Sequence, residues 1–283
     1  MTLSLNIYDT KFLIKCSKFN VFNNKKIKNL IPKIIRTQFW HIIGGFNYSH
    51  RMTFTMFTTH VSSKDAQNVI TRSLAAMPQD WQNAICEFRK HIKSNVAMAK
   101  DGTYAVHWVC HNDKILIQMA QKCGFPRGFC VVVFADETKP VILGTFYPKF
   151  NNDTRNRAIT ISDFKQLSKV VITRKLSGNN GIVVITPYGW HVSSKNSALM
   201  VRENGEFCYP LENSKVVAPY LTDEVLNTLR LIGVVSIGIE VYHTSDMSHG
   251  YSYKESGFGV TSMTKDFDET GHPLFLGPDS LAD

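Results

Sequence analysis

A series of short runs rich in β-branched and aromatic residues constrains the fold of this chain more than any other sequence feature. The runs are residues 103–109, 128–134, 139–146, 169–173, 181–186 and 234–241. Such runs are typical of strands, and the segments between them carry the Asn, Asp, Gly and Pro residues that form turns. The sequence therefore predicts a mixed α+β domain, dominated by antiparallel sheets with flanking helices.

Two helices are expected before the first of these strands. Residues 63–77 have a helical pattern, and Pro78 suits the first position of a second helix. In that second helix Trp81, Ile85, Phe88 and Ile92 recur at helical spacing and form one apolar stripe. We interpret the stripe as core packing.

The net charge of +9 is unevenly distributed along the chain. Residues 1–51 contain nine of the 32 Lys and Arg residues and one of the 23 acidic residues, which leaves 23 basic and 22 acidic residues in 52–283. The basic balance thus belongs to the first segment, and it is no evidence that the main domain binds nucleic acid. We expect 1–51 to be a basic leader outside the fold: a transit peptide, a disordered arm, or sequence upstream of a true start at Met52.

Cysteine usage and hydropathy bear on the compartment. None of the six cysteines forms a Cys-x-x-Cys pair, which points to reduced, mostly buried thiols in a reducing compartment. No apolar run reaches the roughly 18 residues of a membrane-spanning helix. We expect a soluble, monomeric intracellular protein of the cytoplasm or nucleus that has no membrane partner.

The segment 170–197 carries the most chemical information. A strand ends at Lys175, and a Ser-Gly-Asn-Asn-Gly turn follows it. A free lysine has a pKa of about 10.4, so only about one in 10³ is an unprotonated nucleophile at neutral pH. A lysine that attacks a substrate therefore needs neighbouring cations that lower its pKa, and these must come from elsewhere in the chain.

Four segments in this order resemble motifs of the covalent nucleotidyltransferase superfamily, and most of all phage RNA ligases and the ligase domain of fungal tRNA-splicing enzymes. The block RKLSGNNG resembles the motif in which a lysine is followed two residues later by Asp-Gly. Upstream, the single segment FPRGFCVVVFADETKPVILGTFYPKFNN resembles an Arg-Gly strand followed by a Pro-x-Lys-Phe-Phe-Asn element. Downstream, WHVSSKNS resembles a Ser-Lys strand, and IGIEVY resembles a strand that ends with a glutamate. The likeness covers residues 103–265 and implies an ATP-grasp-like nucleotidyltransferase domain.

This resemblance implies an ATP-dependent RNA ligase that acts in RNA repair or tRNA splicing. Lys175 would attack the α-phosphorus of ATP and hold AMP as a phosphoramidate. The AMP would then pass to an RNA 5′-phosphate, and the end would be sealed to a 3′-OH. RNA ends, including tRNA halves, would be the partners, and the choice among RNA substrates stays open.

The same resemblance assigns five further residues, with ATP and Mg²⁺ as cofactors. Gly178 would let the backbone approach the nucleotide. Glu240 would act on the ribose or on water bound to Mg²⁺. The three cations that surround the phosphates, and that lower the pKa of the nucleophile, would be Arg127, Lys149 and Lys195.

The chain departs from the family pattern at three points. Asn151 stands where the second Phe of the Phe-Phe-Asn element is expected. Ser177 replaces the aspartate of the lysine motif. The family's later motifs, a metal-binding glutamate and a Lys-x-Lys pair, are not found among the 43 residues (283 − 240) after Glu240. The segment 250–267 instead resembles a linker. We therefore expect a C-terminally shortened domain, and the alternative function is an inactive remnant that binds nucleotide or RNA.

Two other patterns point to different chemistry. The stretch 99–104, AKDGTY, misses a second lysine signature because Ala99 stands where lysine is needed, so we interpret it as a turn before a strand. His-Val-Ser triplets at His60 and His191 are similar to the paired motifs of 2H phosphoesterases, which hydrolyse RNA ends without ATP. We favour the ligase because His191 already lies within its Ser-Lys strand.

Overall fold

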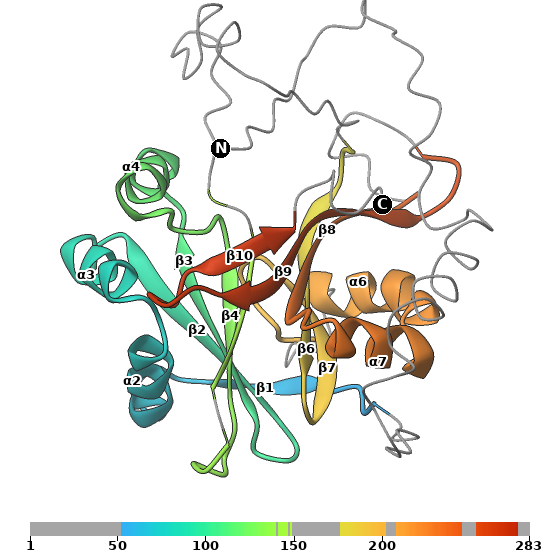
Figure 1. The fold of residues 1–283 in the computed structure, drawn as a ribbon, viewed down its shortest axis with the longest axis horizontal. Coiled ribbons are helices and arrows are strands. Elements are labelled where there is room, and N and C mark those ends of the chain that lie inside the picture. Colours follow the sequence, from blue (N-terminus) through green and yellow to red (C-terminus); the bar gives the residue numbers. More distant parts are fainter. Residues whose placement is uncertain are drawn as a thin grey trace, which may run out of the picture. The chain divides into compact units, whose positions relative to one another are not determined.

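Two five-stranded antiparallel sheets organise this computed structural model, which describes residues 52–139, 141–146, 148, 176–201, 208–244 and 253–276. The first sheet consists, in spatial order, of β1 (Phe57–Val61), β2 (Ile92–Ala99), β3 (Tyr104–Cys110), β4 (Phe129–Val133) and β5 (Ile142–Thr145). The second consists of β10 (Pro273–Leu276), β9 (Gly257–Phe267), β8 (Ser236–Tyr242), β6 (Asn179–Thr186) and β7 (Gly189–Ser194) (Figure 1). The α+β class with antiparallel sheets is thus confirmed. The expected leader, residues 1–51, and the expected strand 169–173 lie outside the described residues.

Five predicted strands coincide with β3, β4, β5, β6 and β8, but other parts of the sequence prediction were wrong. Ile92 was assigned to a helical stripe, whereas the helix ends at Glu87 and Ile92 begins β2. The segment expected to be a linker contains β9, which pairs with β8 along its length. The Ala99 turn prediction is confirmed, because the N–H of Gly102 donates to the Ala99 carbonyl at 3.1 Å and β3 starts at Tyr104.

Helices cover the outer face of the first sheet. They are α2 (Gln67–Ala75), α3 (Gln79–Glu87) and α4 (Asp113–Cys123). Trp81 of α3 is fully buried in this layer, and its ring centroid lies 5.6 Å from that of Phe125 and 5.8 Å from that of Phe129. The side chain of Asn112 caps α4 by accepting from the N–H groups of Lys114 and Ile115. The apolar stripe therefore forms core up to Ile85, as predicted, and the helix layer is anchored on β4.

The two sheets pack face to face through small and apolar side chains. The buried cluster between them comprises Phe57, Ala97, Ala99, Ala105, Cys130, Val132, Phe134, Phe146, Ile182, Val184 and Ala198. Three polar contacts join β5 to the second sheet: the N–H of Thr145 donates to Ser236 Oγ at 3.0 Å, Ser236 Oγ donates to the Thr145 carbonyl at 3.4 Å, and Thr145 Oγ1 lies 2.9 Å from Thr264 Oγ1. Because side chains alternate along a strand, this face also carries Asn95 and His107 in the first sheet and Asn180 and Glu240 in the second.

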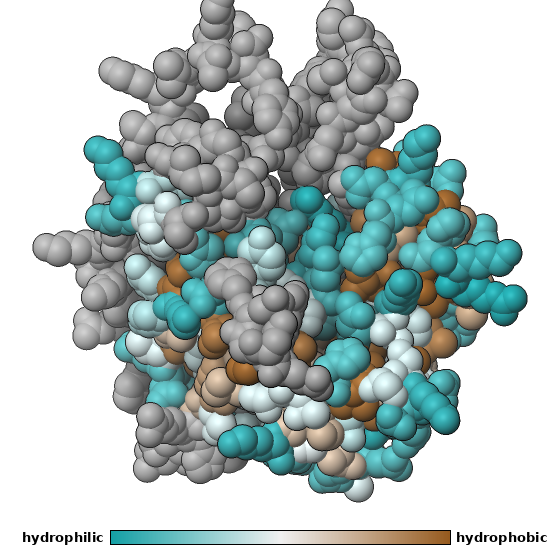
Figure 2. All heavy atoms as spheres, turned by 180° about the vertical axis from the view of Figure 1, so that it is seen from behind, coloured by the Kyte–Doolittle hydropathy of each residue, from teal (hydrophilic) through white to brown (hydrophobic). Residues whose placement is uncertain are grey.

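Two more helices, α6 (Tyr209–Val217) and α7 (Asp223–Leu231), contact the second sheet through β6 and β7 (Figure 1). Polar and hydrophobic side chains are interspersed on the face that Figure 2 shows, and the exposed hydrophobic residues include Tyr220 and Leu231. Among the described residues, no helix is long and apolar enough to cross a membrane.

The cysteine prediction is only partly correct, because Cys130 and Cys208 are buried but the other described thiols are exposed or half-buried.

Candidate nucleotide-binding site

The site forms around the start of β6, at one end of the space between the sheets. Asn180 of β6 lies opposite Glu240 of β8 in the antiparallel register. The Glu240 carboxylate accepts a hydrogen bond from the N–H of Gly178 at 3.1 Å, and its other oxygen accepts one from the Asn180 side-chain amide. Glu240 is therefore held by the turn that follows the predicted nucleophile.

Gly178 needs to be glycine for a reason that the sequence did not reveal. A Cβ at this position would collide with the backbone carbonyl of Val241 in β8. The turn can approach β8 only without a side chain here, which gives the glycine a packing role. A close approach of this backbone to a nucleotide stays a prediction.

Lys195 brings the first sheet into the site. It follows the end of β7, and its backbone N–H donates to the Asn180 carbonyl at 3.2 Å. A Cβ on Gly128 would lie 2.9 Å from both Lys195 Cβ and Lys195 O, so the start of β4 packs directly on this lysine. Arg127, the residue before Gly128, is thereby placed beside Lys195.

A second link between the sheets supports the same end of the structure. The Asn95 side chain of β2 donates to the Asn196 carbonyl at 2.9 Å. The positions of Arg127, Gly178, Lys195 and Glu240 are thus connected through adjacent backbone segments. Asn180 completes this group, and sequence analysis missed it because only the register of β6 against β8 shows that it faces Glu240.

Two of the predicted site residues, Lys175 and Lys149, lie outside the described residues. Their described neighbours are close to the site. Leu176 directly precedes the Ser177–Gly178 turn, and Pro148 pairs with Pro126 in an antiparallel bridge next to Arg127. The roles of the two lysines stay predictions.

The charge pattern of the site combines two half-buried cations, Arg127 and Lys195, with one half-buried carboxylate, Glu240. In the described part of the chain, no group of three or more His, Cys, Asp or Glu side chains is arranged to hold a metal ion. Mg²⁺ commonly binds through one or two carboxylates together with substrate phosphates, so Glu240 suits that smaller role. Two cations at this end of the sheets have the charge that a polyphosphate would require, and the hydrogen bonds of Glu240 hold Gly178 and Asn180.

Two histidines lie buried behind the site, between the sheets. Burial lowers the pKa of His107 to about 3, and burial together with the neighbouring His107 lowers the pKa of His191 to about 3. His191 Nε2 lies 3.5 Å from Cys130 Sγ, and burial raises the pKa of that thiol. A buried, neutral His191 has no access to a substrate and His60 is exposed on β1, so this pair does not form the paired histidine site of a 2H phosphoesterase.

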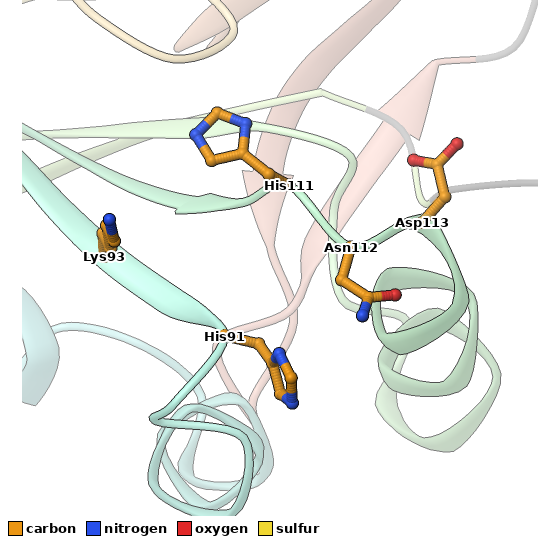
Figure 3. A pocket seen from close by; sticks show the side chains of 5 residues that line it. All are labelled: His91, Lys93, His111, Asn112 and Asp113. Atoms are coloured by element: carbon orange, nitrogen blue, oxygen red, sulfur yellow. The ribbon is translucent and has the colours of Figure 1, made fainter.

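A shallow hollow of about 560 Å³ lies where β2 begins and β3 ends. Figure 3 shows its lining side chains, which include His91, Lys93 and His111 from these strand ends. Lys93 lies two residues before Asn95 on the same face of β2, so the hollow continues the face that carries the site. Two residues of a strand span about 7 Å, so Lys93 lies about that far along β2 from Asn95, whose side chain contacts the Asn196 carbonyl.

Comparison of the chain with models of known protein families gives no match, and comparison with curated proteins gives none either.

Proposed function

We propose that this chain carries the adenylate-forming domain of an ATP-dependent RNA ligase, with Lys175 as the nucleophile. One observation supports this most. Arg127, Gly178, Lys195 and Glu240 come from four separate segments that were selected by motif order, and the backbone contacts of β4, β6, β7 and β8 bring these positions together. A chance resemblance of four short segments gives no reason for such a convergence.

In this proposal the Lys175 amine loses its proton and forms a bond to the α-phosphorus of ATP. The bond between that phosphorus and the bridging oxygen breaks, and pyrophosphate leaves. Arg127 and Lys195 stabilise the negative charge on the phosphates, and their positive field favours the neutral amine of Lys175. When bound, Mg²⁺ supplies further charge neutralisation, with Glu240 as the described carboxylate that would hold it.

Two transfers complete the reaction. An oxygen of the RNA 5′-phosphate attacks the phosphorus of the lysyl-AMP, the P–N bond breaks, and the lysine regains its proton. The 3′-OH of a second RNA end then attacks the activated 5′-phosphate, loses its proton and releases AMP. Lys93 would add one more cation for the RNA backbone, in a hollow that Asp113 also lines.

The test is covalent labelling with α-labelled ATP and Mg²⁺, followed by denaturing electrophoresis. The full chain should retain label, and Lys175→Ala should abolish it while its circular dichroism stays unchanged. Lys100→Ala is the matched control, because Lys100 is exposed in the turn between β2 and β3. Labelling that survives Lys175→Ala would refute the role of this lysine.

The alternative function, an inactive remnant that binds nucleotide or RNA, predicts a different result. Such a protein would take up no label, but ATP would still raise its unfolding temperature. Arg127→Gln should then reduce that stabilisation as strongly as in the ligase. Labelling and thermal shift together therefore separate the two functions.

A further inference from the structure

Three successive residues after the predicted nucleophile are held by the second sheet. The Leu176 side chain packs so closely on Gly259 of β9 that a Cβ there would collide with it. The N–H of Ser177 donates to the Tyr253 hydroxyl at 2.8 Å, and the N–H of Gly178 donates to Glu240 at 3.1 Å. The backbone directly after position 175 is thus fixed at consecutive positions.

Tyr253 is itself held in place by the end of β8. Its ring stacks on that of Tyr242, with centroids 4.2 Å apart and planes 25° apart. Tyr242 is the last residue of β8, two residues after Glu240. The groups that hold Ser177 and Gly178 therefore depend on the same strand end, which a stacked aromatic pair stiffens.

We infer that Tyr253 is a positioning residue for Lys175, acting through the backbone of Ser177. This inference rests on the proposed function, because it takes Lys175 as the group that attacks ATP. An attacking amine must lie in line with the bond that breaks, and a misplacement of about 1 Å can reduce the rate about 10²-fold. A hydrogen bond two residues from the lysine limits the movement of the short segment that carries it.

Tyr253→Phe is the sharpest variant, because it removes the hydroxyl and retains the stacked ring. We expect the Ser177 amide proton to exchange with solvent at least about 10-fold faster, since its acceptor is gone. The single-turnover rate of lysyl-AMP formation should fall about 10- to 100-fold. The ATP dissociation constant should change less than about threefold, because Tyr253 holds the backbone rather than the nucleotide. Tyr188→Phe is the matched control, since Tyr188 lies just past the far end of β6 from Gly178 and its ring packs edge-on against Phe134 at 4.9 Å.

The outcomes separate this inference from the proposed function. Unchanged exchange at Ser177, or faster exchange with an unchanged labelling rate, would overturn the positioning role and leave the ligase proposal intact. If the wild-type chain forms no lysyl-AMP, the ligase proposal fails. The positioning role is then decided by the rate at which an amine-reactive acetylating reagent modifies Lys175, measured by mass spectrometry. A rate that Tyr253→Phe alters and Tyr188→Phe does not would support the role, and equal rates would refute it.

Discussion

Replacing Ser236 with alanine would remove a polar contact that joins the two sheets close to the candidate site. Ser236 and Thr145 are both fully buried, and the Thr145 N–H donates to Ser236 Oγ at 3.0 Å. Alanine occupies the space without strain but leaves this buried N–H without its acceptor. The variant therefore measures the cost of an unsatisfied donor between β5 and β8.

The expected loss follows from the burial of both partners. A buried donor left without a partner costs about 1–3 kcal/mol of unfolding free energy. For a domain of 150–250 residues, 1 kcal/mol lowers the unfolding temperature by about 2–4 °C. Ser236→Ala should therefore lower the midpoint by about 2–12 °C.

The assay is thermal unfolding of the full chain, followed by circular dichroism. Ser63→Ala is the matched control, because Ser63 is exposed and its nearest recorded polar contact, Ser94 Oγ, is at 3.5 Å. Such a surface change should stay within about 0.5 kcal/mol. If both variants unfold at the same temperature, the sheets are not joined as the structure shows.

Two further predictions concern the buried histidines and Lys93 in the hollow where β2 begins and β3 ends. Burial lowers the pKa of His107 and of His191 to about 3 in the folded chain, against 6.5 in the unfolded chain. The unfolded chain therefore binds more protons between these values, and the free energy of unfolding, which is unaffected above pH 6.5, decreases as the pH falls towards 3. At pH 5 each histidine should reduce the free energy of unfolding by about 2 kcal/mol. Urea unfolding at pH 7.5 and pH 5 should therefore show that His107→Leu loses less stability on acidification than the wild type. Lys93→Gln should lower the salt dependence of single-stranded RNA binding by about 0.7 in log–log slope, as measured by fluorescence anisotropy. Lys100→Gln should leave that slope unchanged, and equal slopes for the two variants would argue against RNA at the hollow.

The strands that the sequence predicted correctly are those with a strong apolar signal. β4 and β6 are buried on both faces, so their runs of valine and isoleucine are nearly continuous. β2 was missed because Ile92 also continues a helical spacing, and period alone does not separate the two readings of a short segment. β9 was missed because its glycine, lysine and aspartate residues have weak strand preference, and pairing with β8 compensates for this.

Sequence analysis selected part of the candidate site, missed Asn180, and gave none of the contacts within the site. Motif order selected Arg127, Gly178, Lys195 and Glu240, because a family likeness records which residue types recur. The motif order contained no information on the partner of the Glu240 carboxylate. That partner is Asn180, which faces Glu240 because of the register in which β6 pairs with β8. Cross-strand register depends on the packing of whole sheets, which a single sequence does not reveal.

Local arrangement rather than net charge determines what this site can bind. Residues 52–283 contain 23 basic and 22 acidic side chains, a balance that predicts no affinity for nucleic acid. The fold nevertheless places Arg127 next to Gly128, which packs on Lys195, and Lys93 two residues along β2 from Asn95, which contacts the residue after Lys195. A few cations on one face neutralise only a few phosphates, so RNA binding by this domain should depend on salt with a slope near two rather than the much steeper slopes of proteins that follow a long stretch of backbone. If the domain is the RNA ligase proposed above, most of its affinity must then come from the bound nucleotide and the reacting end.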